Sequence, residues 1–299
     1  MNNALQVWLR QQLGAALRSH SPVGGGCIHS AWMLQLADGR RVFVKCNRAA
    51  ALPLLEAEAD GLAALAAVAP AELLLPTPLA CARVGDQAVL VLSWLDLKPR
   101  GDDRDWSRLG QSLARLHRRS LEQGAGQGRF GWQRDNFIGS TPQINAWHDD
   151  WGAFFVERRL RHQLRQAPAS ARRLAGTERL LLRVSSLLAA HQPEPVLVHG
   201  DLWSGNAALL PGDTAAIYDP AVYRGDREVD LAMARLFGGF PAAFFSGYEQ
   251  EWPLPPGARE RVDVYNLYHL LNHANLFGGG YWQQVEACIQ LLINREVPG

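Results

Sequence analysis

A segment between residues 196 and 219 places two carboxylates and one carboxamide after apolar runs that predict short strands. Asp201 and Asn206 follow the apolar run of residues 196–198, and Asp219 follows a second run at residues 215–218. Gly200 and its polar neighbours favour a turn, but a turn alone requires neither the spaced asparagine nor the second aspartate. The pattern therefore predicts two short strands that bring Asp201, Asn206 and Asp219 together.

These three groups are the ones that phosphoryl transfer from ATP requires. An aspartate accepts the proton of the attacking hydroxyl, while an asparagine and a second aspartate hold the Mg2+ that neutralises the phosphates. The pattern H-R-D-x-x-x-x-N followed by an Asp-led metal motif has the same order and the same Asp-to-Asn spacing. We therefore interpret Asp201 as the catalytic base and Asn206 and Asp219 as Mg2+ ligands, with ATP as the phosphoryl donor.

A glycine loop stands upstream, where a phosphate-binding loop is expected. Gly24, Gly25 and Gly26 would let backbone N–H groups approach phosphate without side-chain obstruction. Three glycines are more often an ordinary loop, so this signal depends on its neighbours. Cys27 follows directly, and its oxidation would distort the loop if the thiol has thiolate character.

Lys45 is the candidate for the lysine that contacts the ATP phosphates. The turn Asp38-Gly39 between two apolar stretches predicts a hairpin, and its second strand ends at Lys45. Lysine stands only at positions 45 and 98, although lysine and arginine together number 30. A compact ammonium differs chemically from a guanidinium, so this lysine fits a phosphate contact.

The helix predicted over residues 52–68 offers two glutamates as partners for Lys45. Glu58 lies within the apolar stripe of that helix, whereas Glu56 shares its face with Asp60. A carboxylate on an apolar face is costly unless it is paired. We therefore predict that Glu58 pairs with Lys45.

The apolar run at residues 87–95 predicts a buried strand. In a kinase, this strand leads into the hinge whose backbone contacts adenine. We therefore assign adenine binding to Ser93, Trp94 and Leu95, although a core strand without nucleotide would have the same pattern.

The distribution of predicted elements indicates an α+β fold with two lobes. We expect a protein-kinase-like arrangement, with a small N-terminal lobe of one antiparallel sheet and one helix and a larger, mainly helical C-terminal lobe. An amphipathic helix is also expected over residues 1–18. The polar stretch from position 98 sets the predicted boundary between an ATP-binding lobe at 1–97 and a catalytic and acceptor-binding lobe at 98–299.

Charge, cysteines and apolar runs exclude several classes of protein. The net charge of +1 is dispersed, so no basic stripe for nucleic acid is present. The four cysteines show neither C-x-x-C pairing nor a secretory pattern. No uninterrupted apolar run has the length of about 18 to 20 residues that a membrane span needs. We expect a cytoplasmic monomer without nucleic-acid or membrane partners.

The short distance between Asp219 and Asp230 bears on the acceptor. Ten residues separate them, which leaves no room for the long segment on which protein kinases dock peptides. We expect Asp230 to cap the following helix and His199 to orient the catalytic loop. The acceptor is then a small molecule or an exposed side chain.

The chain resembles the fructosamine/ketosamine 3-kinase family from the glycine loop almost to its end. The His-Gly-Asp and Asn motifs are shared with aminoglycoside phosphotransferases and choline kinases, so they identify only the superfamily. Asn-Phe-Ile-Gly at 136–139 and Leu-Phe-Gly-Gly-Gly-Tyr at 276–281 are more selective. The matching segments are 24–28, 56–59, 135–143, 151–155, 159–160, 199–206, 218–223, 225–233, 267–273 and 275–281.

The resemblance implies ATP-dependent phosphorylation of the 3-hydroxyl of a ketosamine (ribulosamine or fructosamine), free or on a protein lysine. The unstable 3-phosphate breaks down and frees the amine, which amounts to deglycation. Trp203 is a candidate apolar wall for the sugar, and Asn136 is a candidate substrate contact or loop cap. The stretch from His29 to Trp32 departs from the small and polar residues expected there.

Two alternatives remain open at this point. A related small-molecule kinase acting on an aminoglycoside or a choline-like alcohol would use the same base and metal ligands. The second alternative is a nucleotide-binding pseudokinase that acts as a scaffold. A scaffold does not require Asp201, Asn206 and Asp219 together, so their presence favours a kinase.

Overall fold

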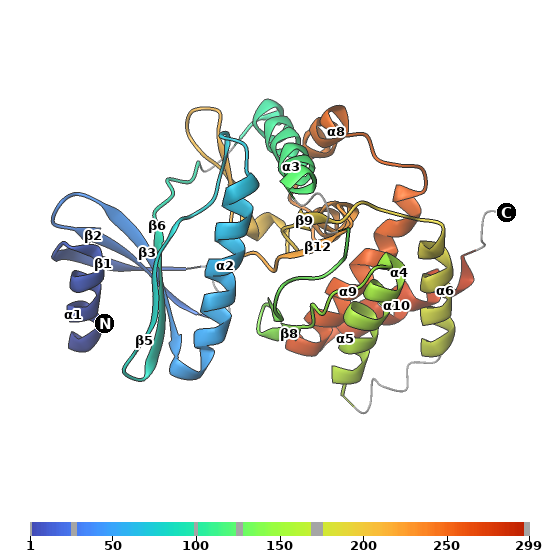
Figure 1. Ribbon diagram of the computed structural model, residues 1–299, viewed down its shortest axis with the longest axis horizontal. Coiled ribbons are helices and arrows are strands. Elements are labelled where there is room, and N and C mark those ends of the chain that lie inside the picture. The colour runs from blue at the N-terminus through green and yellow to red at the C-terminus, as the bar shows by residue number, and fades with distance from the viewer. Residues whose placement is uncertain (1, 25–28, 99–100, 124–127, 169–175, 296–299) are drawn as a thin grey trace.

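The N-terminal part of the chain forms a five-stranded antiparallel sheet with the strand order β1-β2-β3-β6-β5 (Figure 1). The computed structural model describes residues 2–24, 29–98, 101–123, 128–168 and 176–295. The predicted hairpin is present, because Leu36 N–H donates to Arg40 O at 2.8 Å and Gly39 has φ of +89°. The strands are β1 (Leu17–Val23), β2 (Ser30–Leu36), β3 (Arg41–Arg48), β5 (Pro78–Val84) and β6 (Gln87–Ser93).

Two helices cover opposite faces of this sheet. Leu5 and Leu9 of α1 (Asn3–Leu13) pack with one set of strand residues, whereas Leu55 and Leu62 of α2 (Leu52–Val68) pack with another. Helix α2 follows the short η1 (Ala49–Ala51) and lies between the sheet and the helical part of the molecule (Figure 1). The N-terminal part therefore holds both expected helices, the one over residues 52–68 beside the sheet and the amphipathic one near the N-terminus.

The helix expected over residues 1–18 is shorter than predicted. It ends at Leu13 because Gly14 adopts a left-handed conformation with φ of +66° and its N–H donates to Arg10 O. Leu17, which continues the apolar spacing of the helix, instead begins β1. A glycine at this position is a common helix terminator, and it outweighs the apolar period.

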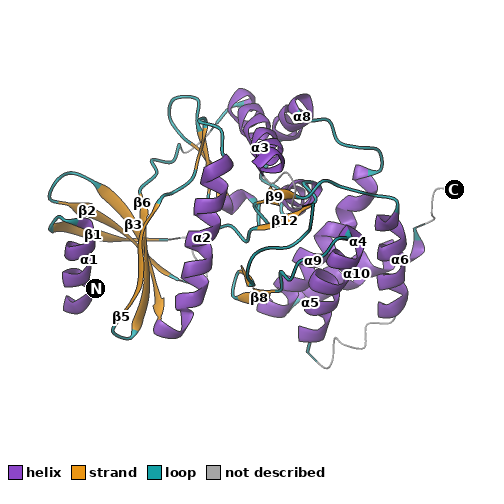
Figure 2. Cartoon of the chain, viewed as in Figure 1, coloured by secondary structure: helices purple, strands orange, loops and turns teal. Residues whose placement is uncertain are grey.

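The remainder of the chain is mainly helical, as expected for the α+β class (Figure 2). One helical stretch begins at Trp151, where the Asp150 side chain accepts from Ala153 N–H. The helices are α3 (Asp103–Gln123), α4 (Trp151–Phe154), the π-helix η2 (Phe155–Leu160), α5 (Arg161–Gln166), α6 (Thr177–Ala189), α7 (Glu228–Leu236), α8 (Ala242–Glu251), α9 (Ala258–Phe277) and α10 (Gly280–Asn294).

Short strands within the helical part carry the loops of the site. Strand β9 precedes Asp201 and its antiparallel partner β12 follows Asp219, while β10 pairs with β11 between these two residues. Strand β11 also pairs in parallel with β4, which follows α2 in the chain. The remaining bounds are β4 (Leu73–Leu74), β7 (Asn136–Ile138), β8 (Thr141–Gln143), β9 (Val196–Val198), η3 (Ser204–Asn206), β10 (Ala207–Leu209), β11 (Ala215–Ile217) and β12 (Tyr223–Gly225).

None of the helices within the described ranges combines the length and apolar character needed to cross a lipid bilayer.

Candidate active site

The loop after β9 holds Asp201 in a fixed turn. Gly200 has φ of +82°, and a Cβ at this position would lie 2.1 Å from Ala221 O, so only glycine fits. Asp201 N–H donates to His199 Nδ1 at 3.3 Å, and the buried His199 ring contacts Tyr218 O through Nε2 at 3.0 Å. His199 therefore ties the Asp201 loop to the strand that precedes Asp219, as the sequence predicted.

Asn206 and Asp219 lie beside Asp201, as the spacing predicted. Asn206 Nδ2 donates to Asp201 O at 2.9 Å and to Asp201 Oδ2 at 3.3 Å. Burial raises the pKa of Asp201 to about 7, and the nearby Asp219 carboxylate raises it further, against the hydrogen bond from Asn206. A carboxyl group with this pKa can accept a proton near neutral pH.

We expect kcat/KM to fall as the pH drops below about 7, because the base must be deprotonated to accept the hydroxyl proton. The raised pKa of Asp201 sets the direction, since the protonated and inactive form prevails below it. A profile of kcat/KM from about pH 5 to pH 9 should therefore lose about tenfold per unit on its acid side. A profile that stays flat to about pH 5 would contradict the assignment of Asp201 as the base.

Lys45 connects helix α2 with the segment that follows β11. Its Nζ donates to Glu58 Oε1 at 2.8 Å and to Asp219 Oδ1 at 2.5 Å, with Lys45 only 6% exposed. Burial lowers the pKa of Lys45, but Glu58 and Asp219 outweigh it and raise the pKa overall, so the ammonium stays charged. Burial also raises the pKa of Glu58, to about 7, against the effect of Lys45. The helical phase that selected Glu58 over Glu56 thus gave the correct partner.

The oxygen donors around Asp219 fit a hard divalent cation. Asp219 has φ of +57° and a side chain that is 46% exposed. Asn206 uses its amide nitrogen on Asp201, which leaves its oxygen as a donor for a metal. Burial raises the pKa of Asp201, and repulsion from the Asp219 carboxylate raises it further. A cation bound between the two carboxylates would offset this repulsion. Carboxylate and amide oxygens are the ligands that Mg2+ prefers.

The glycine loop begins at Gly24, directly after β1, with open space where a Cβ would stand. Gly25, Gly26 and Cys27 lie outside the described residues. The next described residue, His29, was not predicted to belong to the site. Its Nδ1 lies 2.9 Å from Asn47 Nδ2. Burial lowers the pKa of His29 to about 4, and the Lys45 ammonium lowers it further. His29 is therefore a neutral hydrogen-bonding group beside Lys45, at the point where the sequence departs from the expected pattern.

The predicted hinge follows β6, but its three residues are not equivalent. Ser93 N–H donates to Thr77 O at 2.9 Å, and Ser93 Oγ accepts from Thr77 N–H at 2.8 Å. Ser93 is thus held in the sheet. The half-buried Trp94 and Leu95 follow the end of the strand.

Trp203 and Asn136 have different environments. Trp203 is 39% exposed, and its ring covers Gly205, where a Cβ would lie 2.3 Å from the indole. Asn136 is 4% exposed, with its Nδ2 donating to Val222 O and its Oδ1 accepting from Gln143 and Asn145. Trp203 therefore stays a candidate wall for the acceptor, whereas Asn136 has the contacts of a loop-holding residue.

Asp230 corrects one expectation. It was predicted to cap the next helix, but α7 begins at Glu228, so Asp230 lies inside its first turn. Its carboxylate accepts from His199 N–H at 2.7 Å and from Gly200 N–H at 2.8 Å. Helix α7 thus begins three residues before the predicted start at Leu231. Asp230 therefore does not cap the helix but anchors the Asp201 loop.

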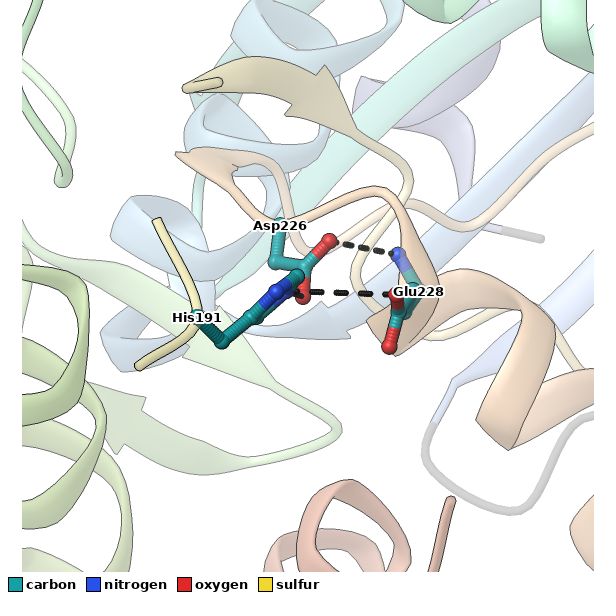
Figure 3. Close-up of side chains that lie close together, drawn as sticks. All are labelled: His191, Asp226 and Glu228. Atoms are coloured by element: carbon teal, nitrogen blue, oxygen red, sulfur yellow. Dashed lines mark hydrogen bonds and ion pairs between the residues drawn. The ribbon is translucent and has the colours of Figure 1, made fainter. Parts of the chain in front are cut away.

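A second group of ionisable residues lies away from this site, beside a cavity of about 720 Å3 (Figure 3). His191 Nε2 lies 2.7 Å from Asp226 Oδ2, and Tyr265 O–H donates to the same oxygen at 2.6 Å. Glu228 accepts two hydrogen bonds from Arg261. His191, Asp226 and Glu228 have the donor types of a metal site, but these carboxylates already have protein partners.

Comparison with known proteins identifies the family. A family model described as fructosamine kinase matches residues 1–295. A probable ketoamine kinase from Synechocystis is 46% identical over 275 residues, covering 92% of this chain and 90% of the relative. A probable ketoamine kinase from Escherichia coli K12 is 41% identical over 282 residues, covering 93% and 94%.

Solved structures agree with these relatives. A putative fructosamine-3-kinase from Thermobifida fusca superposes with a TM-score of 0.83 at 28% identity, covering 99% of this chain and 100% of that one. The aminoglycoside phosphotransferase APH(4)-Ia superposes with a TM-score of 0.62 at 17% identity over 96% of this chain and 98% of that one, which supports the fold alone. The predicted two-lobed kinase-like fold is thereby confirmed. The chain is a kinase and belongs to the fructosamine kinase family.

Proposed function

We propose that this kinase transfers the γ-phosphoryl group of ATP to the 3-hydroxyl of a ketosamine. One observation carries the chemistry: Lys45 lies within hydrogen-bonding distance of both Glu58 and Asp219, while Asn206 bonds Asp201. This arrangement supports the assignment of a phosphate contact, a cation site and a base to neighbouring residues. Family membership supplies the acceptor class, since the matched family is described as fructosamine kinase.

Each of these residues has a distinct role in the proposal. Asp201 accepts the proton of the 3-hydroxyl, and Lys45, held by Glu58, contacts the phosphates. Asn206 and Asp219 would hold Mg2+, which neutralises phosphate charge when it is bound. The glycines at 24–26 would cover the phosphates, and the backbone of Trp94 and Leu95 would contact adenine.

The short connection from Asp219 to α7 supports an acceptor that is small or projects from a surface. Strand β12 and α7 follow the metal motif directly, so no long platform for an extended peptide intervenes. We propose both free ketosamines and glycated lysines as acceptors. Breakdown of the 3-phosphate would release the amine, so the enzyme would repair glycation. We further propose that it acts as a cytoplasmic monomer, with an ATP-binding lobe at 1–97 and a catalytic lobe at 98–299.

ADP release by the purified protein with ATP and Mg2+ tests the proposal. Ribulosyl-lysine and fructosyl-lysine should be turned over, while kanamycin and choline should not, with the Asp201→Ala variant as the blank. Turnover of kanamycin or choline without turnover of either ketosamine would show that the proposed acceptor class is wrong. ATP binding without turnover of any acceptor would instead point to a scaffold.

Truncation of Trp203 should weaken acceptor binding more than it slows chemistry. Its half-open indole lies two residues after the base, and loss of an aromatic wall removes about 1 to 2 kcal/mol of contact, or roughly tenfold in KM. Steady-state kinetics should show this rise for Trp203→Ala, a smaller change in kcat, and partial recovery for Trp203→Phe. A fall in kcat with unchanged acceptor KM would indicate that the indole instead supports the loop through Gly205.

A further inference from the structure

The Asp230 carboxylate, which anchors the Asp201 loop, has a further partner on a different helix. His117 of α3 is fully buried, and its Nε2 lies 3.1 Å from Asp230 Oδ2. The opposite ring nitrogen, Nδ1, lies 2.9 Å from the hydroxyl of Tyr248 of α8. A chain of buried contacts therefore runs from α8 through α3 and α7 to the backbone of the Asp201 loop.

The direction of the hydrogen bond between His117 and Asp230 follows from the charge of the Asp230 carboxylate. The pKa of Asp230 is lowered, because hydrogen bonds from His117 and Gly200 outweigh the opposing effect of burial. An ionised carboxylate only accepts hydrogen bonds, so the His117 proton lies on Nε2. On the other side of the ring, Nδ1 lies within hydrogen-bonding distance of the Tyr248 hydroxyl. The tyrosine thus holds the ring with Nε2 directed at Asp230.

The helices are built to bring these two side chains together. A Cβ at Gly110 of α3 would lie 2.0 Å from Phe244 O, and a Cβ at Gly247 of α8 would lie 2.1 Å from Ser107 O. The two backbones can approach this closely only because both positions are glycine. The close packing of α3 against α8, visible in Figure 1, places Tyr248 directly on the His117 ring.

We infer that His117 and Tyr248 are positioning residues for phosphoryl transfer, which act through Asp230 on the Asp201 loop. His117 donates to the carboxylate that holds His199 and Gly200 N–H, and Tyr248 holds the His117 ring in the orientation that directs Nε2 at Asp230. This inference rests on the proposed role of Asp201. It adds two fully buried residues, one on α3 and one on α8.

The Tyr248→Phe variant tests the inference, with Tyr265→Phe as its matched control. Tyr265 is also a fully buried tyrosine with a hydrogen-bonded hydroxyl, but it donates to Asp226 in the second cluster and not toward Asp230. We expect kcat to fall about tenfold in Tyr248→Phe, while KM for ATP stays unchanged. A tenfold fall corresponds to a rise of about 1.4 kcal/mol in the activation free energy. Tyr265→Phe should keep kcat within about twofold.

A pair of substitutions at position 117 separates the two hydrogen bonds. Glutamine places its amide N–H near the position of Nε2, so His117→Gln can still donate to Asp230. Asparagine reaches only the position of Nδ1, so His117→Asn keeps the contact with Tyr248 alone. We expect His117→Gln to keep more of the wild-type kcat than His117→Asn.

The rates are measured with whichever acceptor the wild type turns over fastest, water included. A wrong ketosamine assignment and a wrong inference about His117 therefore give separate results. Unfolding midpoints of the variants show whether a loss of kcat follows a general loss of stability. Equal kcat in Tyr248→Phe and Tyr265→Phe, or a better rate for His117→Asn than for His117→Gln, would overturn the inference.

Discussion

Replacing Asp201 with asparagine should lower kcat by about a thousandfold, within the range that a positioned general base contributes. Asparagine keeps the size of the side chain and can still contact Asn206, but it cannot take the hydroxyl proton. ATP affinity should change little, because Lys45, Glu58 and Asp219 remain in place. Steady-state kinetics, together with calorimetric titration of ATP, measure the two effects separately.

An exposed aspartate provides the control for this substitution. Asp149 has a side chain that is 82% exposed and pairs with Arg129 at the surface. Asp149→Asn should retain the wild-type kcat. An Asp201→Asn variant that keeps more than about a tenth of the wild-type kcat would show that another group accepts the proton.

Replacing Lys45 with methionine should damage both activity and stability. The lysine contacts Glu58 and Asp219 in a buried position, so its loss leaves Glu58 in an apolar site without a cation. Removing one partner of a buried pair costs about 3 to 5 kcal/mol in the free energy of unfolding. Loss of the phosphate contact should also reduce kcat/KM for ATP by about a hundredfold or more.

The stability loss in Lys45→Met should depend on pH in a defined direction. Burial raises the pKa of Glu58, and Lys45 opposes this shift, so the variant should hold the Glu58 proton even more tightly. A folded state that binds more protons than the unfolded state loses stability as the pH rises. Urea unfolding should therefore show a larger loss at pH 8 than at pH 6.

The other lysine of the chain is the matched control. Lys98 pairs with Asp105 at the surface, where a single ion pair contributes little to stability. Lys98→Met should leave kcat/KM and the unfolding free energy near their wild-type values. Equal effects of the two lysine substitutions would contradict the role given to Lys45.

Local chemistry made much of the site predictable from the sequence. The spacing of Asp201, Asn206 and Asp219 predicted that they lie together, and helical phase distinguished Glu58 from Glu56 as the partner of Lys45. Turn chemistry at Gly39 gave the hairpin that presents Lys45. Each of these inferences depends on neighbours within a few residues along the chain, where periodicity and turn preference are strong.

Partners far apart in the chain were not predictable in the same way. Asp230 looked like a cap because its carboxylate precedes an apolar run, but its partners His199 and Gly200 lie 31 and 30 residues away. His117 and Tyr248 are 131 residues apart and meet only because glycines let α3 and α8 approach. Asn136, a candidate substrate contact or loop cap, donates to Val222 O across 86 residues, a partner that the sequence did not indicate. Tertiary contacts of this kind leave no periodic signal.

The most direct measurement is the identity of the phosphorylated product. Ribulosyl-lysine or fructosyl-lysine is incubated with the enzyme, ATP and Mg2+, and the product is followed by 31P NMR and mass spectrometry. We predict one phosphate on the 3-hydroxyl of the sugar, formed at the rate of ADP release, followed by release of free lysine. A stable phosphate on another hydroxyl, or ADP release without any phosphorylated sugar, would contradict the proposed reaction.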